Sequence, residues 1–289
     1  MLVSLHDVTV GEPDRDLVLT GFDVDAGSVR TGDTEWPMRH GSRPGRDYLD
    51  AGSITMTLRT GRHIRTHAHA AEVVSGFMSA WRHDLDLPAG KTTALLIETP
   101  AGARVVHGRC GRISPPVADS VLARQGLLEV IAEFRLLDPL AYGVTASSVA
   151  LSVIPKSIGG IIAPIITPVT TTMTSGIEYR MLTVTGEGPA PLRVIFHGPA
   201  RDPSVMVGGT EIGVVGEITY DETVVVDGRT RSVHLDDAAQ TPAGHRLSRA
   251  SRLDLLRVPP GTHEVAFTAT DRTGTARVTV EATPTYYHL

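Results

Sequence analysis

Residues 127–143, LLEVIAEFRLLDPLAYG, decide the fold of this chain. Apolar residues alternate here with mostly charged ones, which is the period of a strand with one buried and one wetter face. The first set is Leu128, Val130, Ala132, Phe134 and Leu136, and the second is Glu129, Ile131, Glu133 and Arg135. Because proline cannot donate a ladder hydrogen bond and restrains its predecessor, we expect the strand to stop at Asp138-Pro139. We interpret this stretch as the last strand of one domain and the exit to another.

Two upstream segments complete the central part of that domain. Residues 53–59 alternate as a second strand, with Ile54, Met56 and Leu58 on one face and Ser53, Thr55, Thr57 and Arg59 on the other. A stripe at helical spacing predicts an amphipathic helix that covers a sheet: Ala70, Val73, Val74, Phe77, Met78 and Trp81. Thr66 is placed to cap its start, and Pro88 lies beyond its end.

The rest of the N-terminal half predicts short strands and turns. Residues 2–10 and 17–22 have strand character, and residues 26–50, rich in glycine and proline, are expected to be loop. Residues 93–99 and 103–109 flank Pro100-Ala101-Gly102 and predict a hairpin.

The stretch between residues 144 and 178 has a different composition. Residues 157–177, SIGGIIAPIITPVTTTMTSGI, carry no charge. Their two prolines and three glycines argue against a membrane-spanning helix, because proline breaks helices. We expect an extended linker or belt, and a role as a fusion peptide is the less favoured alternative.

From Tyr179 onward the pattern is strand throughout. Asp227-Gly228 between two apolar runs predicts a hairpin. Evenly spaced short strands with turns indicate a β-sandwich. The expected strands are residues 181–185, 192–197, 204–207, 211–215, 218–220, 223–226, 231–235, 253–257, 264–269 and 276–281.

Composition restricts the function. The chain has 289 residues, 41% of them hydrophobic, enough for two ordinary domains with their own cores. A net charge of −5 without basic tracts argues against tight, specific binding of nucleic acid. The single cysteine, Cys110, excludes an intrachain disulfide and a CxxC metal site. The N-terminus has no basic region before an apolar run, so we expect no signal peptide and synthesis in the cytoplasm.

No motif in the sequence predicts a catalytic, cofactor or metal site. Lys91 follows Ala89-Gly90, but a P-loop needs a glycine where Leu85 stands and a strand before its helix. His63, His67 and His69 lack a well-placed carboxylate and are expected to be polar residues at a helix entrance. Cys110 beside Arg109 and Arg112 has no flanking catalytic signature. The adjacent pairs Asp221-Glu222 and Asp236-Asp237 point to opposite faces if they lie on strands, which is unsuitable for acid and base catalysis.

The chain resembles the distal tail proteins of long-tailed, non-contractile bacteriophages. Four features carry the resemblance: the segment from Met38 to Arg59, Asp138-Pro139 with Tyr142-Gly143, the uncharged connector, and Pro260-Gly261-Thr262-His263 before the last strands. His263 stands where the family pattern has asparagine, which puts the side-chain hydrogen bond of that turn in doubt. The resemblance covers nearly the whole chain through the order and spacing of motifs that are weak singly.

The resemblance implies a mainly β protein with three parts. Residues 1–146 would form a tail-tube-like sheet or barrel domain with one packed helix, residues 147–178 the linker or belt, and residues 179–289 a galectin-like β-sandwich. It also implies a structural virion protein, made in the host cytoplasm and located at the tail tip. A ring of this protein, hexameric in the family, would join the tail tube protein to the tail-tip hub and leave a bore for the tape measure protein and DNA.

A ring around a bore needs a sheet with one face against a helix and the other face wet. We therefore expect the wet faces of the two central strands to line the bore or a subunit boundary: Thr55, Thr57, Arg59, Glu129, Glu133 and Arg135. An ordinary solvated sheet face explains the same pattern equally well.

The alternative function is a carbohydrate- or host-surface-binding module of the tail tip. Sugar sites need exposed aromatic rings, and the C-terminal half offers Tyr220, Tyr286 and Tyr287 but no tryptophan. A third class, a β-sandwich hydrolase, is disfavoured by the carboxylate spacing, so we do not expect an enzyme.

Overall fold

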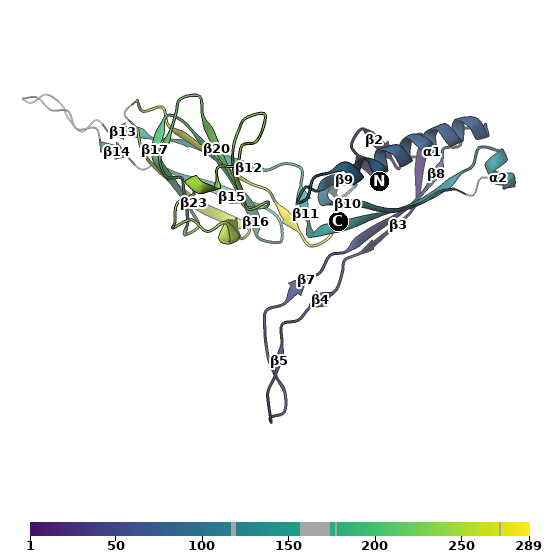
Figure 1. Cartoon of the computed structure of the whole chain (residues 1–289), viewed down its shortest axis with the longest axis horizontal. Coiled ribbons are helices and arrows are strands. Elements are labelled where there is room, and N and C mark those ends of the chain that lie inside the picture. Colours follow the sequence, from purple (N-terminus) through teal and green to yellow (C-terminus); the bar gives the residue numbers. More distant parts are fainter. Residues whose placement is uncertain (117–119, 157–173, 177, 272) are drawn as a thin grey trace, which may run out of the picture. The chain divides into compact units, whose positions relative to one another are not determined.

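The computed structural model describes residues 1–289 except 117–119, 157–173, 177 and 272. The chain divides into two compact units, Met1–Val144 with Tyr287–Leu289, and Thr145–Tyr286. The described residues are mostly in strands, which confirms the predicted mainly β class (Figure 1). No helix among them is long and apolar enough to cross a membrane.

The first unit is built on an antiparallel sheet with the strand order β2-β1-β9-β10-β11-β8-β3. Its long central strands are β10, Gly102–Ser114, and β11, Glu129–Gly143, and β11 also pairs with β8, Ser53–Thr60. The remaining strands are β1 (Leu2–Leu5), β2 (Val8–Val10), β3 (Leu17–Asp25) and β9 (Thr93–Thr99). Residues 2–10, expected as one strand, form the β1–β2 hairpin, because His6 turns the chain with a φ of 50°.

Helix α1, His67–Arg82, lies along one face of this sheet (Figure 1). The predicted stripe is confirmed: Ala70, Val74, Phe77 and Trp81 are buried, and Trp81 meets Phe134 of β11 edge to face with ring centroids 6.3 Å apart. The side chain of Thr66 accepts the hydrogen bond of the His69 backbone N–H, as the N-cap prediction required. A 3₁₀ turn, η1 (His83–Asp86), follows α1, and a one-turn helix, α2 (Val121–Arg124), precedes β11.

The predicted strand end at Asp138-Pro139 is wrong. β11 continues to Gly143, and its register against β10 shifts between Leu136, opposite Gly108, and Ala141, opposite Val106. Residues 137–140 therefore form a bulge. Pro139, which has no backbone N–H, lies within this segment and so removes no hydrogen bond from the ladder. The Leu140 backbone N–H donates to Asp138 Oδ1 at 3.2 Å, so a side chain within the bulge satisfies a backbone donor of the bulge.

Residues 26–50, expected to be loop, contain a narrow hairpin that we call the arm, residues 28–49. Strands β4 (Val29–Arg30) and β7 (Tyr48–Leu49) pair at its base. Strands β5 (Thr34–Glu35) and β6 (Ser42–Arg43) pair near its tip. The arm extends away from the sheet of its own unit as a two-stranded ribbon (Figure 1).

The second unit is a sandwich of two antiparallel sheets. One has the order β12-β24-β16-β20-β21 and the other β15-β23-β17-β18, with β22 and β19 added at the sides of β16 and β17. Their inward side chains form one valine-rich core that includes Phe196 and Phe267, 6.5 Å apart. The bounds are β12 (Ser147–Ser152), β15 (Glu178–Val184), β16 (Ala190–His197), β17 (Ala200–Val207), β18 (Thr210–Gly213), β19 (Glu217–Ile218), β20 (Thr223–Asp227), β21 (Ser232–Leu235), β22 (Arg257–Val258), β23 (Gly261–Thr270), β24 (Arg277–Ala282) and β25 (Thr285–Tyr286).

Three features differ from the sequence-based expectation for this half. Residues 147–152, assigned to the linker, form β12 and pair with β24. The local sequence does not indicate this strand, because its pairing partner is far away in sequence. Residues 253–257, expected as a strand, begin with the 3₁₀ turn η3 (Leu253–Leu255), and another 3₁₀ turn, η2, spans Gly244–Arg246. β13 (Ile154–Lys156) pairs with β14 (Thr174–Gly176), and most of the uncharged stretch lies outside the described residues.

The Asp227-Gly228 hairpin is confirmed as β20–β21, although the turn differs from a two-residue one. Asp227 pairs with Ser232, and Arg231 takes the positive φ of 53°. Oδ1 of Asp227 accepts from the backbone N–H groups of Arg229 and Thr230, which fixes the longer loop.

Candidate functional site

The face of the first sheet opposite α1 carries the predicted site residues. Val130, Ala132 and Phe134 are fully buried on the α1 side, so the intervening residues of β11 point the other way. The ladder places Glu129 opposite Arg59, Ile131 opposite Thr57 and Glu133 opposite Thr55. The structure therefore brings the six predicted residues together on one wet face: Thr55, Thr57, Arg59, Glu129, Glu133 and Arg135.

Neighbouring strands extend this face with charges of both signs. Arg109 of β10 lies opposite Arg135, and Asp23 of β3 lies opposite Thr55. Arg109 is held in place, because its guanidinium donates to the backbone carbonyls of Lys91 and Pro88 at 3.1–3.3 Å. Ile131 in the middle of the face is 44% exposed. The surface thus carries charges of both signs around an apolar centre. Such a surface suits a hydrated contact and does not suit the retention of a polyanion.

The arm is a second candidate surface, and its base is fixed by local polar contacts. The Gly27 backbone N–H donates to Asp25 Oδ1 at 3.0 Å, and the Asp50 N–H donates to Ser28 O at 2.9 Å. Further out, the Gly45 N–H donates to Asp33 Oδ1 at 2.8 Å. The two strands approach so closely here that a Cβ on Gly45 would lie 1.9 Å from the carbonyl oxygen of Gly32. Glycine at this crossing is therefore a packing requirement.

Every residue of the arm from 28 to 49 is exposed. Near its base, the guanidinium groups of Arg30 and Arg46 lie 5.7 and 5.4 Å from the Tyr48 ring. Its tip presents Trp36, 45% exposed, and Met38, which is entirely exposed. A two-stranded ribbon buries too little apolar surface to be stable alone in water, and large apolar side chains at an exposed tip are typical of a protein contact.

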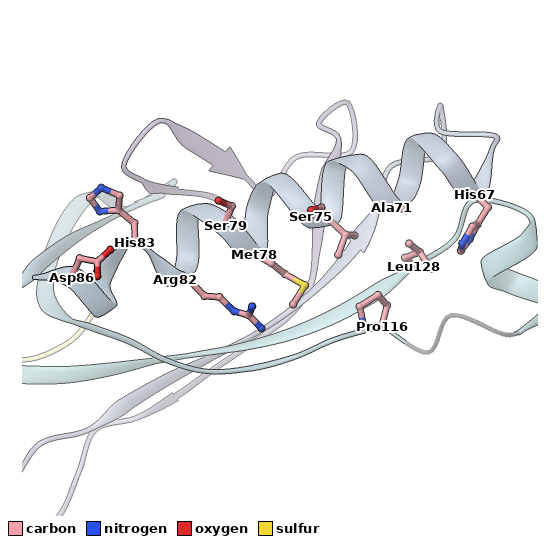
Figure 2. A pocket seen from close by; sticks show the side chains of 11 residues that line it. His67, Ala71, Ser75, Met78, Ser79, Arg82, His83, Asp86, Pro116 and Leu128 are labelled. Atoms are coloured by element: carbon pink, nitrogen blue, oxygen red, sulfur yellow. The ribbon is translucent and has the colours of Figure 1, made fainter.

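A groove of about 650 Å³ runs beside α1 (Figure 2). One flank of the helix, from His67 to Arg82, forms one side, and Pro116 and Leu128 form the other. Met78 points into the groove between them. Small side chains such as Ala71 and Ser75 leave the groove open, and Arg82 and Asp86 supply its charge. It is a mixed surface hollow, and the six predicted residues lie on the other face of the sheet.

The three histidines near the helix entrance do not converge. His63 Nε2 lies 2.8 Å from Asp16 Oδ1, whereas His67 Nδ1 lies 3.0 Å from the carbonyl oxygen of Ala123. His69 contributes its backbone N–H to the N-cap. Across the described residues, no group of three or more histidine, cysteine, aspartate or glutamate side chains is arranged to hold a metal ion.

The other residues considered for chemistry have structural surroundings. Cys110, the single cysteine of the chain, is half-buried in β10. Glu222 pairs with Arg246 and accepts from the Thr219 N–H, so it fixes the turn before β20. Asp237 accepts from the hydroxyl and backbone N–H of Thr241, and these bonds hold the pKa of its carboxyl below the ordinary value.

The tyrosines considered as sugar platforms are dispersed along the chain. Tyr220 is 76% exposed between β19 and β20, whereas Tyr286 is half-buried in β25 and Tyr287 follows it. The turn before β23 keeps a side-chain hydrogen bond although His263 stands where asparagine was expected. His263 Nε2 lies 2.7 Å from the carbonyl oxygen of Pro259 and closes the turn.

Sequence reasoning found the sheet face but missed the arm and the groove. The face has a period-two signal within two strands. The arm has no hydrophobic periodicity. The sequence features that could have indicated it are the two glycines, Gly32 and Gly45, and the large apolar residues Trp36 and Met38 between them. The groove forms between α1 and residues that are distant in sequence, so no local pattern encodes it.

Comparisons with known proteins place the fold. No family model matches the chain, and no curated protein matches it either. Among solved structures, the chain is similar to the Dit protein of phage SPP1, described as a paradigm of the hub adsorption apparatus in phages that infect Gram-positive bacteria. The TM-score is 0.57 at 11% identity, covering 98% of each chain.

The chain is also similar to a chain of the phage P2 baseplate in its activated conformation with calcium. That TM-score is 0.56 at 9% identity, covering 98% of this chain and 97% of the other. The strontium form of the same baseplate gives 0.55 at 9% identity, covering 98% and 96%. At these identities the likeness establishes a shared fold over essentially the whole length.

Proposed function

We propose that this chain is a distal tail protein of a long-tailed, non-contractile bacteriophage, a structural component of the tail tip of the virion. Its task is to connect the tail tube protein to the tail-tip hub through a closed ring of copies, six in the proposed assembly. The bore of that ring passes the tape measure protein and then the DNA. The mechanism is geometric and requires no catalysis, cofactor or metal.

The exposed arm is the observation that carries this proposal. Residues 28–49 form a hairpin that buries none of its own side chains, yet its tip carries Trp36 and Met38. Such a ribbon gains stability by lying on another protein surface. A heterologous contact joins two different surfaces of identical copies. It closes into a ring when the rotation from one copy to the next is a whole fraction of a full turn. We therefore assign the arm to the contact between neighbouring copies.

The wet sheet face supports the same proposal. Its six predicted residues are two arginines, two glutamates and two threonines around Ile131, and they form no basic cluster that would retain DNA. We assign this face to the bore or to the subunit boundary. The similarity to hub and baseplate proteins over the full chain supports a structural role at the tail tip.

Native mass spectrometry and negative-stain imaging of the purified full chain test the proposal. We expect a closed oligomer with a central hole, and Trp36→Ser with Met38→Ser should reduce its population. Addition of the cognate tail tube protein should increase ring formation if closure needs a partner. A strict monomer at high concentration, alone and with that partner, contradicts the ring. A cryo-electron microscopy map with Thr55, Thr57 and Glu133 on the outer surface contradicts the bore assignment.

A further inference from the structure

The groove beside α1 has the size and the lining of a pocket for large apolar side chains. Its volume is about 650 Å³, which lies in the range of pockets that enclose a small molecule. Val74, Met78 and Leu128 line its middle. Met78 belongs to the apolar stripe of α1 but is only half-buried, because it points into the groove (Figure 2). A flexible thioether at this place adapts to an irregular apolar partner.

The groove also carries one charge of each sign at the end of the helix. Arg82 is the last residue of α1, and Asp86 is the last residue of the turn η1 that follows it. Both side chains line the groove and are exposed. A matching occupant therefore combines large apolar side chains with an acidic and a basic group beside them.

The tip of the arm has this composition. Its sequence is Trp36-Pro37-Met38 between Glu35 and Arg39, and all five residues are exposed. The Trp36 N–H donates to Gly41 O at 3.3 Å, and the Arg39 N–H donates to Trp36 O at 3.4 Å. These two hydrogen bonds close the tip into a defined loop. A loop that is already shaped loses little conformational entropy when it binds.

The groove of the same chain does not hold this tip. The described residues that line the groove include none from the arm, and the arm extends away from its own sheet (Figure 1). From residue 28 to Met38 the arm reaches roughly 33 Å, at about 3.3 Å per residue. Every copy of the chain offers one tip and one groove, so the two surfaces can meet only between copies and the contact can repeat.

We propose that the groove beside α1 receives the arm tip of a neighbouring copy. Trp36 and Met38 enter between α1 and Leu128 and cover Met78, so that large apolar side chains fill the centre of the contact. This inference rests on the proposed function, because it gives the arm its receiving surface on the next copy of the ring.

The charges set the direction in which the tip enters. Glu35 precedes the apex of the loop and Arg39 follows it, so both lie behind the apolar side chains. An apex that enters from the end of α1 leaves both charges at that end. Glu35 then lies beside Arg82, and Arg39 lies beside Asp86. Opposite charges on the two surfaces favour this orientation and disfavour the reverse one.

Methionine oxidation tests the proposal on the full chain without any substitution. Hydrogen peroxide is added at protein concentrations at which the chain is dissociated and at which it is assembled, and sulfoxide formation is followed by peptide mass spectrometry. Met206, exposed in the second unit, gives the reference rate. Because oxidation follows exposure, Met38 and Met78 should both oxidise about fivefold more slowly, relative to Met206, in the assembled protein.

The outcomes separate this inference from the proposed function. An assembled ring in which Met38 is protected and Met78 is not places the arm elsewhere on the neighbour, which overturns the inference and leaves the ring and the arm contact intact. Protection of Met78 alone assigns the groove to another part of the neighbour and also overturns it. A ring that protects neither residue removes the arm contact as well. A chain that stays monomeric, alone and with the tail tube protein, overturns the ring and the groove contact together.

Disulfide trapping provides a second test in a Cys110→Ala background. Met38→Cys is combined with Ser75→Cys, on the flank of α1 that lines the groove, and the oxidised protein is run on a gel without reductant. We expect a ladder of crosslinked oligomers. The matched control replaces Ser75→Cys by Gly76→Cys, about 100° further round the helix, where nothing lies within 4 Å of the Cβ position. Assembled protein without crosslinks, or equal ladders from the two pairs, overturns the proposal.

Discussion

The hydroxyl of Tyr142 donates a hydrogen bond of 2.6 Å to Oδ2 of Asp138, four residues earlier on the same strand. The other oxygen of that carboxylate accepts the Leu140 N–H. Asp138 therefore holds both ends of the bulge that carries β11 past Pro139, and Tyr142 is buried against the sheet. The Asp-Pro-x-x-Tyr-Gly sequence is thus a self-contained device for bending a central strand without ending it.

Tyr142→Phe should destabilise the first unit by about 1–2 kcal/mol, because a half-buried carboxylate loses a charge-assisted hydrogen bond. Asp138→Asn keeps an acceptor for Leu140 and should cost less. Chemical denaturation monitored by fluorescence measures both. Tyr48→Phe, on the exposed arm, is the control and should change the unfolding free energy very little. A Tyr142→Phe protein as stable as the wild type would show that the bulge does not need this bond.

Glu178→Gln should lower stability at neutral pH by about 1 kcal/mol, since the amide accepts weaker hydrogen bonds than the carboxylate. The Ser152 backbone N–H, with a smaller contribution from Arg180, lowers the pKa of the Glu178 carboxyl below its ordinary value of 4.5. A lowered folded-state pKa means that the stabilisation is complete above the unfolded pKa and is lost as pH falls through the folded one.

The difference in unfolding free energy between wild type and Glu178→Gln should therefore be constant from pH 8 to about pH 5 and shrink below about pH 4.5. Urea denaturation at a series of pH values measures it. Other carboxylates titrate in both proteins and cancel in the difference. A difference that does not depend on pH, or that grows in acid, contradicts the role assigned to the ionised carboxylate.

Gly45→Ala should open the arm, because the new Cβ would collide with the backbone carbonyl of Gly32 at 1.9 Å. The large sheets of both units should be unaffected, so thermal unfolding should change little while limited proteolysis within residues 28–49 becomes several-fold faster. Gly76→Ala is the matched control, since nothing lies within 4 Å of its Cβ position on α1. Unchanged proteolysis of the arm in Gly45→Ala would mean that the close crossing is not maintained in solution.

Trp36→Ser combined with Met38→Ser should weaken self-association without altering the fold. Both side chains are exposed in the single chain, and exposed substitutions usually change stability by no more than about 0.5 kcal/mol. Analytical ultracentrifugation should show that the double variant needs a higher protein concentration than the wild type to reach half-assembly. The thermal midpoint of the dissociated chain should stay the same. Val215→Ser, exposed in the second unit, is the control. Equal assembly of the double variant and the wild type contradicts the role of the arm.

The sequence alone determined the features that depend on neighbours along the chain. The alternation in residues 53–59 and 128–136 identified two central strands and the six residues on their wet face, because side-chain direction in a strand follows from residue parity. The apolar stripe and Thr66 identified α1 in the same way, and Asp227-Gly228 marked its hairpin.

Tertiary structure decided the features that depend on partners far away in sequence. Pro139 stays inside β11 because β10 opposite it shifts register, and residues 147–152 are a strand because β24 lies beside them. The arm exists because glycines thirteen positions apart let two backbones touch, as the Gly32 and Gly45 contact requires. Strand pairing fixes backbone hydrogen bonds between distant residues, and a local pattern holds no information about which distant segment supplies them.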